Sequence, residues 1–173
     1  MAIRGKGYIK TSWAFQERPV ASAKLNTWDG RIAAAFELLV YHASMAWSAA
    51  DGVPRNAATG DLGVVAASTT AMAVAVQPGD AIINRFPFRL EAPASLGGIA
   101  APAAYPRIDL VQARLDTWYV TIKPGAESAS PSPRAPDTAC LALAELYLRP
   151  GMTGVLDADD GVNGYIRDVR TYV

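Results

Sequence analysis

The stretch PRIDLVQARLDTWYVTIK, residues 106–123, contains the two strands that decide the fold. Apolar and polar residues alternate from Ile108 to Leu115, except at the adjacent Leu110 and Val111, and Trp118, Val120 and Ile122 occupy every second position of the next run. An alternation of period two is typical of a β-strand with one buried face. Asp116 and Thr117 separate the two runs and predict a hairpin turn. The side chains expected to share one face of the second strand are those of Trp118, Val120 and Ile122.

Short strands with turn signals between them are predicted on both sides of this hairpin. The predicted strands cover residues 72–76, 81–83, 86–90 and 140–148, with a last short strand within 165–173. A turn is expected at Pro78-Gly79. No helical pattern separates these strands, which disfavours a parallel α/β fold. We therefore expect a mainly β protein whose body, residues 61–173, is an antiparallel β-sandwich of the jelly-roll type.

A proline-rich segment interrupts the strands between Lys123 and Asp137. Four prolines in this segment exclude the interior of a strand. We expect a solvated loop whose shortening lowers the stability of the fold only slightly.

A single long helix is predicted for residues 24–50, ahead of the β-rich body. Asn26 or Thr27 is expected to cap it, Asp29 adds favourable charge to its first turn, and Asp51-Gly52 is expected to end it. The apolar seam, with gaps of four and three, consists of Ile32, Phe36, Leu39 and Ala43. Because the helix is apolar on more than one side, we expect this seam to contact other copies of the chain; packing on its own sheet alone is the alternative.

Residues 1–23 are expected to form an extended arm. The segment contains the bulky side chains of Tyr8, Trp13 and Phe15, but no helical or strand period runs through it. Aromatic residues this close together are unusual in a disordered leader, which is the alternative. We therefore expect an arm that docks on another protein.

Composition and charge exclude several classes of protein. Sixteen basic residues balance sixteen acidic ones, so binding to nucleic acid through a basic field is not expected. The most apolar window, 32–47, is interrupted by Glu37 and His42 and is too short to insert into a membrane. Cys140 is the only cysteine, and the first ten residues lack the apolar core of a secretory signal. The protein is therefore expected to be soluble and made in a cytoplasm.

Motifs of catalysis or cofactor binding are missing from the sequence. His42 is the only histidine and falls inside the predicted helix, which leaves a Ser-His-Asp arrangement without support. Cys140 starts an apolar strand and is expected to be a small buried hydrophobe. The acidic stretch 157–168 lacks the fifth ligand and the glycine of a calcium loop, so an acidic turn is expected. We therefore expect a protein that is not an enzyme and holds no cofactor or metal.

A series of motifs resembles a set of bacteriophage tail and baseplate appendage proteins. The motifs lie, in order, at residues 76–83 (VQPGDAII), 106–116 (PRIDLVQARLD), 123–131 (KPGAESASP) and 143–151 (LAELYLRPG). The resemblance implies a fibre adaptor, that is, a structural virion module of β-sandwich type that joins a tail or connector to fibres. It further implies a homo-oligomer, a trimer or a higher ring, which contacts other tail or connector proteins. The expected location is the virion, after synthesis in the host cytoplasm.

The PRID segment also has a physical interpretation. Pro106 stiffens the entry to the strand, and Ile108 is expected to point inward. Charge-assisted hydrogen bonds of Arg107, Asp109 and Arg114 are expected to lock neighbouring turns into a rigid scaffold.

A second class of function remains open. β-Sandwiches also serve as carbohydrate-binding modules, and Trp13, Trp47, Trp118 and Tyr119 could offer faces for sugar stacking. Trp13 and Trp47 fall outside the predicted sandwich, however, and Trp118 alternates with core residues. The virion adaptor is therefore the preferred hypothesis.

Overall fold

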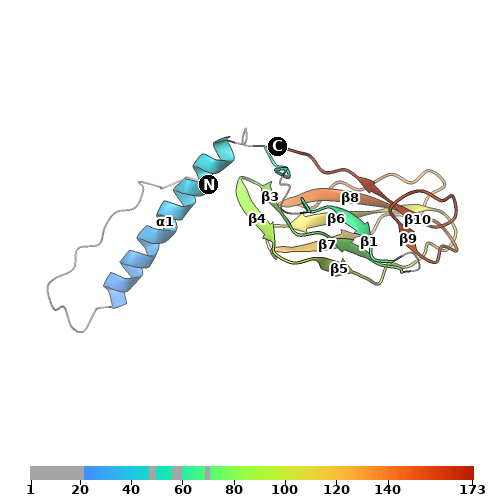
Figure 1. Cartoon of the computed structure of the whole chain (residues 1–173), viewed down its shortest axis with the longest axis horizontal. Helices are drawn as coiled ribbons and strands as arrows, with labels where there is room; N and C mark the ends of the chain where they lie inside the picture. Colours follow the sequence, from blue (N-terminus) through green and yellow to red (C-terminus); the bar gives the residue numbers. More distant parts are fainter. Residues whose placement is uncertain (1–21, 47–49, 56–59, 69–70) are drawn as a thin grey trace. The chain divides into compact units, whose positions relative to one another are not determined.

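The computed structural model describes residues 22–46, 50–55, 60–68 and 71–173. The chain divides into two compact units, residues 1–49 and 50–173. The described part of the first unit is one helix, and the second unit contains the described strands (Figure 1). The predicted arm residues Tyr8, Trp13 and Phe15 lie outside the described residues, as does Trp47.

Helix α1 runs from Ser22 to Ala46 and so begins and ends earlier than predicted. The predicted cap is wrong, because Thr27 lies inside the helix, where its hydroxyl donates to the carbonyl oxygen of Ala23 at 2.8 Å. Asp29 accordingly lies beyond the first turn. Gly52 does not end the helix either, since its backbone pairs with Ile82 in an isolated bridge of the body. Among the described residues, no helix has both the length and the apolar character needed to cross a membrane.

The body consists of short strands. They are β1 (Val64–Ala66), β2 (Val74–Val76), β3 (Gly79–Ile83), β4 (Phe86–Leu90), β5 (Ala94–Leu96), β6 (Arg107–Arg114), β7 (Tyr119–Lys123), β8 (Cys140–Leu148), β9 (Val155–Leu156) and β10 (Gly164–Asp168). The pairing is antiparallel except between β9 and β10. The prediction of a mainly β body with antiparallel sheets is therefore confirmed.

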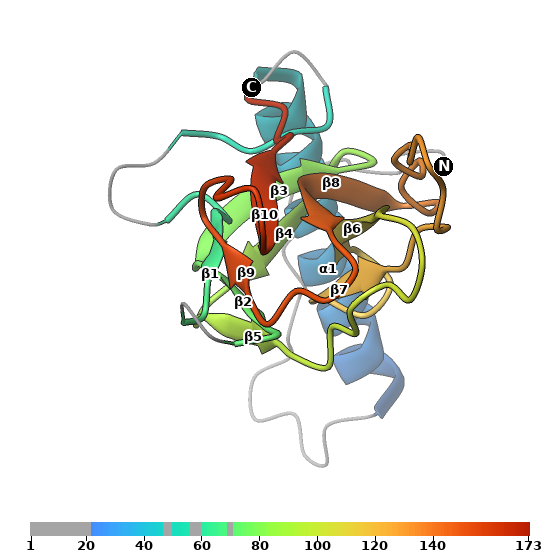
Figure 2. The same ribbon diagram turned by 90° about the vertical axis from the view of Figure 1, so that its right-hand side faces the viewer.

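Three sheets make up the described body (Figure 2). One has the order β1-β2-β5, a second the order β7-β6-β8-β10-β9, and the hairpin β3-β4 forms the third. β1 lies against β9 and β10, and β5 lies against β7. The buried side chains of all three sheets form one hydrophobic core, whose largest fully buried members include Phe88, Leu62, Ile83, Leu143 and Leu146.

The expected turn at Pro78-Gly79 does not join two paired strands. β2 pairs with β1 and β5, whereas β3 pairs with β4, so the chain passes from one sheet to another at this point. Gly79 is already part of β3, and a Cβ there would overlap the backbone of Asp61 and Leu62. The glycine is thus required for close approach of two segments rather than for a turn.

The hairpin of β6 and β7 forms as predicted, with Arg114 opposite Tyr119. Trp118, however, does not share a buried face with Val120. It precedes β7 with a φ of 53°, in the left-handed region, and 55% of its surface is exposed. Its ring stacks on Phe88 with centroids 6.4 Å apart. The positive φ turns the side chain out of the strand's alternation, which is why the prediction is wrong.

Candidate functional site

The first end of β6 holds a buried ion pair. Arg107 donates from Nε to Asp109 Oδ1 at 2.9 Å and from Nη2 to Asp109 Oδ2 at 3.2 Å, and the two side chains are 16% and 3% exposed. Arg107 Nη2 also donates to the carbonyl oxygen of Ala100, and Asp109 Oδ1 accepts from the backbone N–H of Gly125, both at 2.8 Å. The pair therefore ties the strand to the segments that precede and follow the hairpin.

The predicted inward position of Ile108 is wrong. Asp109 pairs with Leu146 and faces the core, whereas Ile108 pairs with Tyr147 on the opposite face and is half-buried. A buried carboxylate is stable here because the guanidinium and a backbone N–H satisfy both of its oxygens.

Arg114, the third residue of the predicted lock, lies at the other end of β6. It donates from Nε and Nη2 to Asp116 at 3.1 and 2.6 Å, and its Nη1 lies 3.7 Å from Asp137. The structure thus brings Arg107 and Asp109 together but separates both from Arg114 by the length of the strand.

The proline-rich loop is mostly exposed, as predicted, but it is also bound to the sheet. Gln112 is 1% exposed; its amide donates to Asp137 Oδ2 at 2.7 Å, and its Oε1 accepts from the Asp137 backbone N–H at 3.0 Å. Lys123 Nζ donates to Asp137 Oδ1 at 2.6 Å. The Lys123 ammonium and then the Gln112 amide lower the pKa of Asp137 below its ordinary value.

The middle of the loop is also anchored. The Glu127 carboxylate accepts from the backbone N–H groups of Ala103, Ala104 and Tyr105 at 2.9, 3.1 and 3.4 Å. These bonds lower the pKa of Glu127, because each one favours the ionised carboxylate. Sequence reasoning missed these anchors, since the residues that they join lie 14 to 25 positions apart.

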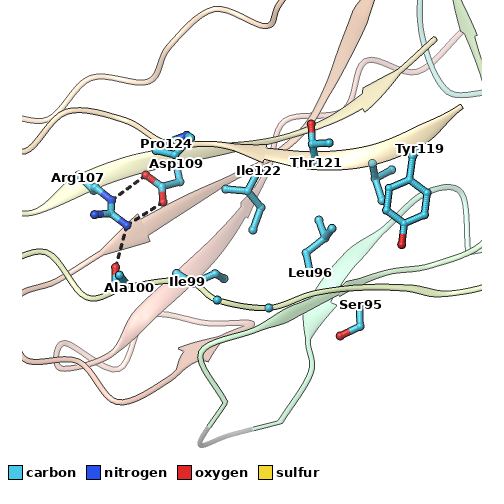
Figure 3. Close-up of a pocket in the computed structure, with 13 residues that line it drawn as sticks. Ser95, Leu96, Ile99, Ala100, Arg107, Asp109, Tyr119, Thr121, Ile122 and Pro124 are labelled. Atoms are coloured by element: carbon cyan, nitrogen blue, oxygen red, sulfur yellow. Dashed lines mark hydrogen bonds and ion pairs between the residues drawn. The ribbon is translucent and has the colours of Figure 1, made fainter. Parts of the chain in front are cut away.

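Beside the buried ion pair lies a groove of about 680 Å³ (Figure 3). One wall is the chain from Ser95 to Ala100, and the other is β7 and Pro124. Figure 3 shows Leu96, Ile99 and Ile122 pointing into the space between the walls, with Arg107 and Asp109 at one end and Tyr119 at the other. The groove is thus apolar along its middle.

Helix α1 carries a stripe of exposed apolar side chains. Phe36 and Leu39 are each 63% exposed, Leu25 and Trp28 are exposed to a lesser degree, and Ile32 is half-buried. At 100° per residue these five positions fall within an arc of about 80°. Ile32, Ala35, Phe36 and Leu39 together line a hollow of about 280 Å³. The fourth predicted seam residue, Ala43, lies within α1. Leu25 and Trp28 lie within the predicted helix, residues 24–50, but were missed because the predicted seam began at Ile32.

In the acidic stretch after β9, Asp159 and Asp160 bond to the backbone of the stretch itself, whereas Asp157 accepts from the backbone N–H of Ala66. Asp160 accepts from the backbone N–H groups of Val162 and Asn163, and Asp159 accepts from the N–H of Gly161 and from Arg149 Nη2. These bonds lower the pKa of both carboxyl groups. In the described part of the chain no three His, Cys, Asp or Glu side chains gather as they would around a metal ion.

Cys140 begins β8 and is half-buried rather than fully buried. Burial raises the pKa of its thiol, which therefore stays protonated at neutral pH. His42 lies within α1.

Comparisons with protein-family models, with curated proteins and with solved structures return no match to this chain. The resemblance to phage appendage proteins therefore stays a prediction from the sequence motifs alone.

Proposed function

We propose that this protein is a structural virion protein of a bacteriophage, a homo-oligomeric adaptor in the tail or connector or at the base of a fibre. The observation that carries the proposal is the exposed apolar stripe of α1. Leu25, Trp28, Phe36 and Leu39 present to water a surface that a monomer has reason to bury. Copies of the helix that pack stripe against stripe remove this surface from water.

We further propose that the body is a β-sandwich in which the three-stranded and five-stranded sheets are the two layers. Both sheets contribute to one core, and they meet along β1 with β9 and β10 and along β5 with β7. Such a body suits a rigid connecting module, because the Arg107–Asp109 pair and the Gln112–Asp137 contacts hold its long loops in place.

The experiment that tests the adaptor is Phe36→Asp in the full chain, followed by light scattering. A charge in the middle of the stripe is expected to shift the assembled species towards the monomer, because an unpaired carboxylate would be buried at the contact. Thr27→Asp is the matched control, since Thr27 is exposed on the opposite face of the same helix. An unchanged mass for Phe36→Asp, with circular dichroism like that of the parent chain, would contradict the proposal.

The alternative function is carbohydrate binding, and one observation favours it. Trp118 and Tyr119, 55% and 48% exposed, lie next to each other at the start of β7, and Tyr119 lines the groove. Exposed aromatic faces of this kind can stack on sugar rings. A glycan array with the parent chain and with Trp118→Ala separates the two functions: binding that the substitution abolishes supports the carbohydrate-binding module.

A further inference from the structure

Charged side chains flank the exposed apolar stripe of α1 on both of its sides. At 100° per residue, Asp29 lies about 60° from the middle of the stripe, on the side of Phe36. Lys24 and Arg31 lie about 80° and 100° from the middle on the other side, beyond Trp28. Asp29 is exposed, and the two basic side chains, which also interact within their own chain, are half-buried. The helix therefore has an acidic flank and a basic flank.

These two flanks distinguish the ways in which copies of the helix can pack stripe against stripe. In a parallel pair, or in a parallel ring, the acidic flank of each helix faces the basic flank of its neighbour. In an antiparallel pair each flank faces the same flank of the other copy, which brings like charges to one side of the contact. Charges beside an apolar seam set the orientation of packed helices in this way. The charges of α1 therefore favour parallel packing.

The spacing along the chain also gives the opposite charges matching heights. Leu25, Ile32 and Leu39 follow one another at intervals of seven and occupy the first position of a heptad. Lys24 then holds the last position of one heptad, and Asp29 holds the fifth position of the next. Parallel helices without offset bring these two positions of neighbouring copies together. Within one helix the two side chains point about 140° apart, so a contact between them joins two copies.

We propose that α1 packs against α1 of a second copy in parallel and without offset, and that Lys24 of each copy pairs with Asp29 of its neighbour. The proposal rests on the proposed homo-oligomer and adds the orientation of its subunits. Because the chain enters the body soon after α1 ends, parallel helices attach all the bodies to the same end of the bundle. Such an assembly offers several copies of one body surface to a single partner, as an adaptor requires.

Disulfide crosslinking in the full chain tests the orientation, with Cys140→Ser in every variant to remove the natural thiol. Chains that carry Leu25→Cys are co-expressed with chains that carry Leu39→Cys, oxidised and digested, and the joined peptides are identified by mass spectrometry. Parallel helices bring each position beside itself, whereas antiparallel helices bring position 25 towards position 39. We expect same-site disulfides to exceed mixed-site disulfides about tenfold or more, since a disulfide forms only between neighbouring Cβ atoms. Thr27→Cys, exposed on the opposite face of the helix, is the matched control.

The ion pair is tested separately, through the mass of the assembly as a function of concentration. Lys24→Glu and Asp29→Lys each place like charges at the contact, and each is expected to raise the dissociation constant about tenfold. The double variant restores opposite charges between the copies and is expected to return to within about threefold of the parent chain. Because the two side chains do not meet within one helix, damage that either change does to its own chain would not be rescued in this way.

The outcomes separate this proposal from the adaptor. In a parent chain that assembles, an excess of mixed-site disulfides, or no disulfide above the Thr27→Cys control, would overturn the parallel packing and leave the homo-oligomer in place. A double variant as weak as the two single variants would overturn the pairing of Lys24 with Asp29. A parent chain with the mass of a monomer at every concentration would contradict the adaptor itself, and this proposal with it.

Discussion

The two ends of β6 carry the same Arg-x-Asp motif in different surroundings. At the first end, Arg107 and Asp109 are nearly buried, and both also bond to backbone groups of other segments. At the other end, Arg114 and Asp116 are 30% and 54% exposed. The two hydrogen bonds of this pair join the end of β6 only to the hairpin turn that follows it. The geometry within each pair is similar, so the surroundings rather than the motif decide which pair stabilises the fold.

This comparison shows how the groove is held. Asp109 joins the strand to Gly125, and Arg107 joins it to Ala100 on the opposite wall. At the exposed end, Arg114 lies 3.7 Å from Asp137 of the loop, and its ion pairs are weakened by solvent screening. The buried pair is thus a structural clamp beside the groove, and substitutions at the two ends of β6 should differ in their cost.

Asp109→Ala is expected to have the largest effect. The substitution leaves the Arg107 guanidinium nearly buried without its carboxylate, and removal of one partner of a buried pair costs about 3 kcal/mol of the free energy of unfolding. Chemical denaturation of the full chain measures the change, with Asp116→Ala as the matched control. A loss for Asp109→Ala no larger than that of the control would show that the two ends are equivalent.

Gly125→Ala is expected to have the second largest effect. A Cβ at this position would overlap the carbonyl oxygen of Ile108, so the loop must move away from Asp109. Overpacking of this kind costs about 2 kcal/mol. Ala126→Ser, at the exposed neighbouring position, is the control for the denaturation experiment. Equal denaturation midpoints for both variants would mean that the loop moves away from the added methyl group without any loss of stability.

Acid is expected to release the loop near the buried pair. The folded state lowers the pKa of both Glu127 and Asp137, so their contribution to stability is present above their ordinary values near pH 4. It is lost as the pH falls through the lowered values. The protection factors for hydrogen exchange at the amides of Ala103, Ala104 and Tyr105 should therefore fall below about pH 4.

Glu127→Gln is the control for this pH dependence. A neutral side chain should weaken the protection of these amides at neutral pH and remove most of the pH dependence. Protection that falls with acid equally in the parent and the variant would assign the effect to other carboxyl groups.

Asp116→Ala is expected to have the smallest effect. Its carboxylate is more than half exposed. After the substitution Arg114 still has a second carboxylate, that of Asp137, at 3.7 Å. The melting temperature should change by no more than about 2 °C. A larger drop by calorimetry would show that the exposed pair also holds the hairpin.

The elements with a clear period were predictable from sequence alone. The alternation over residues 108–122 predicted β6 and β7, and the predictions at 86–90 and 140–148 coincide with β4 and β8. β1, β5 and β9 contain two or three residues each, too few to show a period. Trp118 was misplaced because a left-handed φ interrupts the alternation at that residue.

The candidate site was predictable only in part. The sequence singled out Arg107, Asp109 and Arg114 and expected their charge-assisted hydrogen bonds to lock neighbouring turns. The structure joins Arg107 to Asp109 but leaves Arg114 at the other end of β6. The sequence also predicted an apolar seam on the helix, of which Phe36 and Leu39 are exposed in the structure. The anchoring of the loop and the groove itself went unpredicted, because no local pattern marks them.

By itself, then, the sequence determined the mainly β character of the body, the helix α1, the principal strands and the charged motif, since each depends on the spacing of residues a few positions apart. Only the tertiary structure decided which strands pair, that Asp109 rather than Ile108 faces the core, and that the loop is held down. The physical reason is distance along the chain. Asp157 accepts from the backbone N–H of Ala66 across 91 positions, and Gln112 meets Asp137 across 25. Such contacts form only when the whole body folds around one core, and their partners cannot be read from local spacing.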